Sequence, residues 1–131
     1  MATWDAVLAE ARALPGFDAR AEDEFSLTFE RRQVDGTQRA QRVWLRRYEA
    51  WSTAMVEIRS AFAEAGVMEP EAAMRHNLDL PLGAIARHGD VLVVVCKLPL
   101  TPLSLEGVLF AARRVSMVAD VLEANRGTDR F

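Results

Sequence analysis

Residues 25–47, FSLTFERRQVDGTQRAQRVWLRR, decide how this chain folds. The stretch opens with strict alternation of apolar and polar residues, the pattern of a strand that buries one face. Asp35-Gly36 follows, a residue pair typical of β-hairpin turns. The return run alternates again, with Val43 and Leu45 on its apolar side. The stretch therefore predicts two antiparallel strands joined by a hairpin.

The flanking sequence adds three strands and three helices to this hairpin. Residues 52–62 alternate once more and indicate a third strand, although the join near Ala50-Trp51 holds no Gly or Pro to mark it. The stretch LPLGAIARHGDVLVVVCKLPL, residues 80–100, indicates two more strands about a turn at His88-Gly89. Apolar residues at helical spacing indicate helices over 4–14, 70–78 and 105–124.

The order α-βββ-α-ββ-α favours an α+β fold, because runs of strands are bounded by helices instead of alternating with them one by one. We expect one domain over residues 1–131, with a five-stranded antiparallel sheet and helices packed on one face. The acidic stretch 17–24, FDARAEDE, is interpreted as a connector between the first helix and the first strand.

Composition is that of an ordinary soluble domain. Half of the 131 residues are apolar, 27% are charged, and the chain has a single cysteine. The N-terminus lacks a basic segment followed by an apolar one, so we expect no secretory signal. No apolar run approaches the ~18 residues of a membrane helix. We expect a cytoplasmic protein without membrane contact.

No pattern of catalytic or metal-binding residues is found. Cys96 lies within an uncharged apolar run, whereas a reactive thiolate needs a positive and partly exposed setting. His88 lies at the expected hairpin tip, too far along the strand to activate Cys96. His76, His88 and Asp90 are too few and wrongly spaced for a zinc site. Glycine-rich phosphate loops are absent from the sequence. We therefore expect no enzyme, no metal and no cofactor.

Charge is unevenly distributed along the chain. The net charge is −3, yet residues 1–30 carry −5 and residues 31–47 carry +5. The arginines of 31–47, together with Trp44 and Tyr48, resemble the basic and aromatic mixture of nucleic-acid-binding surfaces. Three interpretations stay open for this hairpin. The favoured one is a solvated or ion-paired strand face, with the acids of the first thirty residues as possible partners. The others are a surface for an acidic protein segment and a nucleic-acid contact.

Apolar residues exceed what one buried core needs. In the helix 105–124 they extend well beyond one face, which indicates a second buried face or a partner. Large exposed apolar patches usually mark interfaces, and a two-fold homodimer through the last strands or the last helix would cover this one. The candidate partner-binding residues are Arg42, Trp44, Arg46, Trp51, Val93, Val95, Phe110, Met117 and Val121.

Three segments together resemble the type III secretion chaperone-like fold, and within it the YbjN-like family described as sensory transduction regulators. They are DGTQRAQRVWLRR at 35–47, HNLDLPLGAIARHGDVLVVVCKLPL at 76–100, and LSLEGVLFAARRVSMVADVLE at 103–123 with its Ala119-Asp120 pair. The resemblance covers about residues 22–124 and implies no catalytic residues. It implies a homodimer that holds an unfolded client segment along apolar faces.

The sequence thus predicts a non-enzymatic protein-binding domain, chaperone-like or a regulatory adaptor, that holds a client segment as a homodimer. The alternative is a regulatory domain that contacts nucleic acid through the Arg-rich hairpin 31–47.

Overall fold

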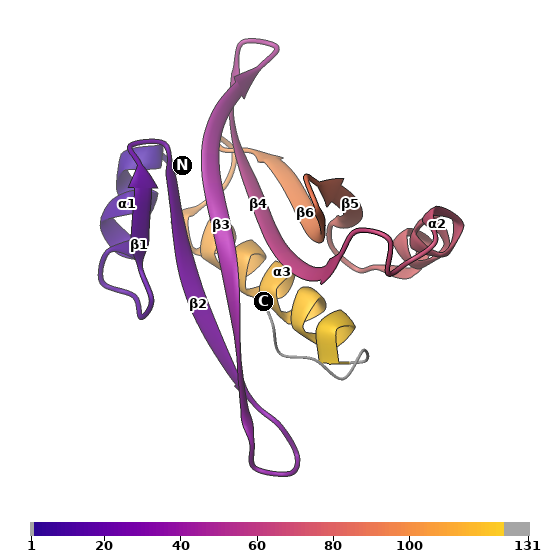
Figure 1. Ribbon diagram of the computed structural model, residues 1–131. Coiled ribbons are helices and arrows are strands. Elements are labelled where there is room, and N and C mark those ends of the chain that lie inside the picture. The colour runs from indigo at the N-terminus through magenta and orange to yellow at the C-terminus, as the bar shows by residue number, and fades with distance from the viewer. Residues whose placement is uncertain (1, 125–131) are drawn as a thin grey trace.

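The computed structural model describes residues 2–124, which form one six-stranded antiparallel sheet and three helices (Figure 1). In chain order the elements are α1 (Trp4–Ala11), β1 (Asp18–Ala21), β2 (Glu24–Arg32), β3 (Gln38–Ala50), β4 (Thr53–Glu64), α2 (Pro70–Asp79), β5 (Ala84–His88), β6 (Val91–Pro99) and α3 (Leu105–Ala124). The α+β class is confirmed. The sequence Asn125-Arg126-Gly127 is typical of a helix end and predicts that the last helix stops there, but these residues lie outside the described ones.

The prediction of five strands is wrong, because the acidic stretch 17–24 is not a plain connector. Asp18–Ala21 forms β1, which pairs antiparallel with the start of β2 and sits at one edge of the sheet order β1-β2-β3-β4-β6-β5. All four residues of β1 are exposed. A strand with no buried face carries no apolar alternation, so the usual sequence signal was missing. The first helix is also shorter than expected and ends at Ala11.

One face of the sheet, here called the inner face, carries the core. Helix α3 packs across it and contacts β3, β4 and β6, while α1 adds Trp4, Val7 and Ala11 to the same core. The apolar sides of β2 and β3 meet in register, with Phe25 opposite Leu45 and all strands antiparallel. Helix α2 stands beside β5 at the other edge of the sheet (Figure 1). The opposite face of the sheet, here called the outer face, lies away from α3.

The stretch 80–100 forms the predicted hairpin of β5 and β6. Val94 and Cys96 point into the core, and Pro99 ends β6. The side chain of Asn77 on α2 makes hydrogen bonds with both backbone groups of Ile85 on β5. Asn77 Oδ1 accepts from the Ile85 N–H at 2.6 Å, and Asn77 Nδ2 donates to the Ile85 carbonyl at 3.3 Å. One carboxamide therefore supplies two hydrogen bonds between α2 and the hairpin.

The join between β3 and β4 is a two-residue turn without glycine. Trp51 and Ser52 have φ of 52° and 59°, the left-handed values that a type I′ turn requires of both central residues. Residues other than Gly, Asn and Asp are strained there. Because neither turn residue is a typical turn former, the sequence holds no signal for the boundary between β3 and β4.

We expect the double substitution Trp51→Asn with Ser52→Gly to raise the free energy of unfolding by about 1 kcal/mol, because Asn-Gly adopts these angles with little strain. Urea denaturation measures the change. Trp51 is 97% exposed, so no buried contact is lost. A variant less stable than the parent would show that the Trp51 side chain contributes to folding in a way this turn geometry does not account for.

Candidate functional site

The outer face presents an aromatic ring surrounded by arginines. Trp44 of β3 lies between Ser26 of β2 and Arg59 of β4 in the strand register. The guanidinium carbons of Arg20, Arg42 and Arg59 lie 4.1, 5.9 and 6.0 Å from the Trp44 ring centre. These are cation–π distances, and they hold the indole in place on an otherwise helix-free face. Arg42, Trp44 and Arg46 therefore lie on the side of β3 opposite to Val43 and Leu45, as the alternation of the return run predicts.

Ion pairs cross the outer face from strand to strand. Glu24, Arg46, Glu57 and Lys97 stand in one row of the register. Glu57 contacts Arg46 at 3.2 Å, Arg59 at 3.0 Å and Lys97 at 3.9 Å, and Arg59 also contacts Glu24 at 3.0 Å. The favoured interpretation of an ion-paired strand face thus holds for Arg46. Its acidic partner comes from β4 and not from the first thirty residues.

Glu57 contacts three cations of the outer face, and these contacts lower the pKa of its carboxyl. Burial raises the pKa of the Glu57 carboxyl, but the hydrogen bond from Arg46 and the charges of Arg46, Arg59 and Lys97 outweigh burial and hold it below its ordinary value. A carboxyl with a depressed pKa in the folded state stabilises the fold above its unfolded pKa. This contribution is lost as the pH falls through the folded pKa.

We expect Glu57→Gln to lower the free energy of unfolding at pH 7 by about 1–2 kcal/mol, because three cations lose their shared anion. The difference from the parent protein should shrink as the pH falls below the ordinary range of glutamate and through the lower folded pKa of Glu57, where the parent carboxyl is protonated too. Urea denaturation at pH 7, 5 and 3 measures this. A pH-independent difference would mean that packing, not charge, sets the role of Glu57.

Val93 and Val95 lie on the β6 side of the outer face. Val93 is 4% exposed and Val95 is half-buried. Both line a shallow hollow of about 130 Å³, together with Arg59, Lys97 and side chains of β5. Its lining thus combines apolar side chains with three cations and the Glu57 carboxylate.

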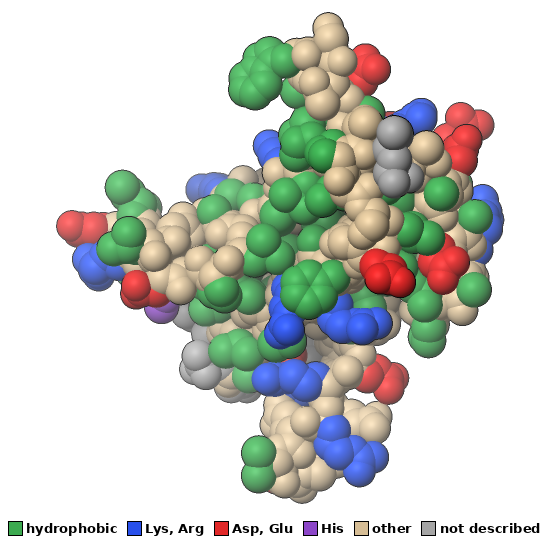
Figure 2. Space-filling view, turned by 180° about the vertical axis from the view of Figure 1, so that it is seen from behind, with side chains coloured by type: hydrophobic (Ala, Val, Ile, Leu, Met, Phe, Trp, Pro, Cys, Tyr) green, Lys and Arg blue, Asp and Glu red, His purple; other side chains and the backbone are tan. Residues whose placement is uncertain are grey.

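Helix α3 carries an apolar stripe on the side away from the sheet. Phe110, Met117 and Val121 are 58%, 37% and 39% exposed, although the opposite side of the helix is buried. Arg114 lies among them, with its guanidinium carbon 4.9 Å from the Phe110 ring centre and Nη1 3.9 Å from the Met117 sulfur. Seen from behind, the side of the molecule on which α3 lies shows hydrophobic side chains among arginines (Figure 2). The structure thus brings three predicted partner-binding residues together here, on the face opposite to Arg42, Trp44 and Arg46.

Trp51 belongs to neither group. It projects from the tip of the β3–β4 hairpin, which extends beyond the body of the sheet (Figure 1).

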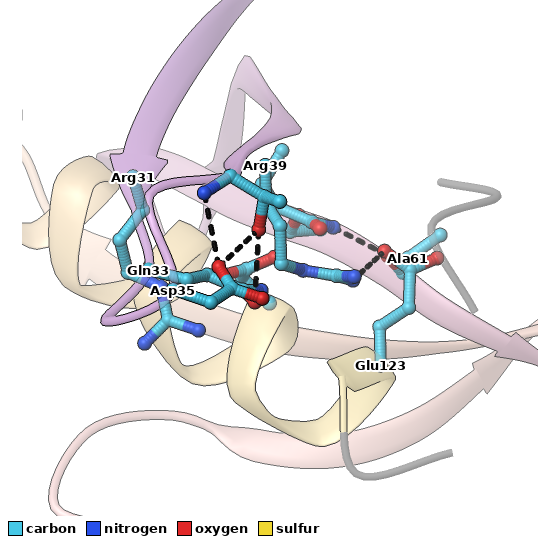
Figure 3. A network of polar contacts seen from close by, with 10 residues as sticks. Arg31, Gln33, Asp35, Arg39, Ala61 and Glu123 are labelled. Carbon is cyan, nitrogen blue, oxygen red and sulfur yellow. Dashed lines mark hydrogen bonds and ion pairs between the residues drawn. The ribbon is translucent and has the colours of Figure 1, made fainter. Parts of the chain in front are cut away.

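Sequence reasoning missed a buried polar cluster under the β2–β3 hairpin. Arg31 and Arg39 lie on the inner face, not with Arg42 and Arg46, and both contact acids of α3. Figure 3 shows Arg39 extending toward Glu123. Arg39 Nε lies 2.8 Å from Asp120 and its Nη2 lies 3.1 Å from Glu123, while Arg31 Nε lies 2.7 Å from Asp120. Asp120 is 2% exposed and Glu123 is fully buried. The hairpin arginines are therefore divided between two faces.

A signal for this cluster was present in the sequence. Continuing the alternation of Phe25, Leu27 and Phe29 by one step places Arg31 on the core side. Two steps back from Val43 place Arg39 on that side as well. The Ala119-Asp120 pair singled out by the family resemblance falls on the buried side of α3.

The remaining polar candidates do not meet. Cys96 is buried in the core, where burial raises the pKa of its thiol, and His88 stands at the far end of the β5–β6 hairpin. His76 is exposed on α2. Among residues 2–124, no three His, Cys, Asp or Glu side chains gather in an arrangement that could hold a metal ion. No helix in this range is both long and apolar enough to cross a membrane.

Comparison with known proteins found neither a matching protein-family model nor a matching curated protein.

Proposed function

We propose that this chain is a non-enzymatic, chaperone-like adaptor domain that binds a segment of another protein and acts as a homodimer. The sequence resemblance to the secretion-chaperone-like fold and the YbjN-like family supports it. So does the element order, which after the added strand β1 follows the order expected from that resemblance.

The observation that carries the proposal is the exposed stripe of α3. The helix already buries Val108, Ala112, Val115 and Ala119 against the sheet, which is enough to hold it in place. An apolar row on the opposite side adds nothing to the fold of one chain. On a helix, two apolar sides indicate two packing partners.

A second copy of the chain fits this stripe by its own spacing. Phe110, Arg114, Met117 and Val121 are separated by four, three and four residues, so the row is the same in both directions. When two such helices pack antiparallel about a two-fold axis, Phe110 faces Val121 of the other copy and Arg114 faces Met117. The Arg114 guanidinium can then lie against the Met117 sulfur of the other copy, as it does within one chain.

Sedimentation equilibrium tests the proposal. Three exposed side chains provide less than the ~800 Å² per partner of a standard interface, so we expect a dimer that dissociates on dilution. Phe110→Glu should give a monomer, and the conservative control Phe110→Leu should keep the dimer. Circular dichroism checks that both variants fold. A strict monomer at about 100 µM, or a dimer unchanged by Phe110→Glu, contradicts the proposed assembly.

A further inference from the structure

A groove separates α2 from the β5–β6 hairpin. It has a volume of about 340 Å³ and a largely apolar lining that includes Met68, Ala73, Met74, Ile85 and Leu92. Ile85 and Leu92 form its floor and belong to the core of the domain. Methionine is flexible and polarisable, and it suits surfaces that accommodate varied apolar side chains. Apart from Asn77, Arg87 is the only polar side chain in the lining.

The groove runs along an edge of the sheet. Strand β5 is the last of the six and pairs only with β6. His88 pairs with Val91 across a two-residue turn, so the backbone groups of Ala84, Ala86 and His88 face β6. Those of Ile85 and Arg87 consequently face the groove. An edge of this kind is a template for another strand.

Asn77 already acts as a substitute strand at this edge. Its carboxamide accepts from the Ile85 N–H and donates to the Ile85 carbonyl, the two bonds that a residue of a neighbouring strand would make. A peptide group of another chain offers the same donor and acceptor as this carboxamide, so it could make the same two hydrogen bonds in its place. The edge therefore holds a partner that another chain can displace.

Helix α2 is weakly held in its present position. None of its residues is buried, its N-terminal Glu69 makes no side-chain capping bond, and Met74 and Leu78 are 71% and 88% exposed. Segments with few buried contacts open at a low free-energy cost. Of the apolar residues of α2, only Ala73 packs against the core, so movement of α2 would widen the groove at a small cost in core packing.

We propose that this groove binds an extended apolar segment of a partner protein, which pairs with β5 at Ile85 and Arg87 as a seventh strand. Alternate side chains of the segment enter the methionine-lined groove, as strand geometry requires. The groove lining has one charge, that of Arg87, so the segment carries an acidic residue at the Arg87 end. This inference rests on the proposed protein-binding function and names the chemistry of the client.

Fluorescence anisotropy with a defined probe tests the inference. The probe is a labelled decapeptide of alternating valine and threonine that ends in aspartate. The matched control peptide is N-methylated at alternate residues, so it keeps its side chains but cannot pair along one edge. We expect the probe to bind with a Kd in the micromolar range, and the methylated peptide to bind at least tenfold more weakly.

Variants of α2 locate the site. Asn77→Ala removes the competitor for Ile85 and should tighten probe binding about three- to tenfold, whereas Ala73→Arg fills the groove and should abolish it. Arg75→Ala, on the exposed part of the same helix, should leave the Kd unchanged. Amide chemical shifts provide a second measurement, with the largest changes expected at Ile85 and Arg87.

Three outcomes overturn the inference. They are no binding at millimolar probe, equal binding of the methylated peptide, and shift changes confined to α3 or the outer face. The last outcome would still leave a protein-binding domain and so spares the proposed function. Binding of the probe in the groove by a parent protein that is a strict monomer, or whose dimer is unchanged by Phe110→Glu, would contradict the α3 dimer and leave this inference standing.

Discussion

Replacing Arg39 by Met is expected to lower the free energy of unfolding by about 3–5 kcal/mol, the usual loss when one partner of a buried ion pair is removed. Arg39 reaches both Asp120 and Glu123, and its own side chain is only 11% exposed. Methionine keeps much of the volume and removes the charge. Two buried carboxylates then lose a cation that they share. Urea denaturation followed by circular dichroism measures the effect.

Two further variants make this result specific. Arg32→Met removes an exposed arginine from the same hairpin and should change stability by less than about 0.5 kcal/mol. Adding Glu123→Gln to Arg39→Met should recover part of the loss, because the buried carboxylate charge that Arg39 balances is gone while Asp120 keeps its contact with Arg31. If Arg39→Met were as mild as Arg32→Met, the cluster would not anchor the β2–β3 hairpin to α3.

This cluster shows how far the sequence could predict the candidate site. The alternation in 25–47 predicted which side chains of β2 and β3 face the core, and the structure confirms it for Phe25, Leu27, Val43 and Leu45. The same alternation was not carried on to the charged residues at the far end of the hairpin. The positive charge of the arginines suggested that they lie on an exposed surface. The position of Arg39 in the alternation of β3 instead places its side chain on the inner face.

The pairing partners of the arginines depended on strand order. Glu57 follows Arg46 by eleven residues and meets it only because β3 and β4 are neighbours in register. Asp120 lies 81 residues from Arg39 and meets it because α3 crosses the inner face. Net charge over a segment carries no information on such long-range contacts. The acids of the first thirty residues looked like partners for the hairpin, yet only Glu24 takes part, and its contacts are Arg20 and Arg59.

The distribution of charge also bears on the kind of partner. A nucleic-acid surface needs several cations free to neutralise phosphates along one face. Here Arg31 and Arg39 are on the inner face with α3, and Arg46 and Arg59 on the outer face are already paired with carboxylates. The groove beside β5 and the stripe of α3 are instead lined mostly by apolar side chains, which suit contacts with protein. For this reason the proposals concern a protein segment and a second copy of the chain.

Replacing Gly83 by Ala is expected to lower the free energy of unfolding by about 3 kcal/mol, through strain at positive φ and a steric clash together. Gly83 has φ of +84°, and a Cβ there would lie 2.9 Å from the carbonyl oxygen of Val95 and 3.2 Å from Cγ1 of Val94. The first of these atoms belongs to the backbone of β6 and cannot move alone. Gly83 closes the Leu-Pro-Leu-Gly segment that leads into β5, so the clash falls on the entry to the hairpin.

Gly66→Ala is the matched control for this substitution. Gly66 has φ of +91°, similar to Gly83, but a Cβ there would meet nothing within 4 Å. Its cost should therefore be the backbone strain alone, about 1 kcal/mol. The difference between the two variants isolates the close approach of Gly83 to β6. Equal losses in urea denaturation would mean that β6 yields to the added methyl group. The Leu-Pro-Leu-Gly segment would then need its glycine only for the turn, and the edge beside α2 would be more pliable than the packing indicates.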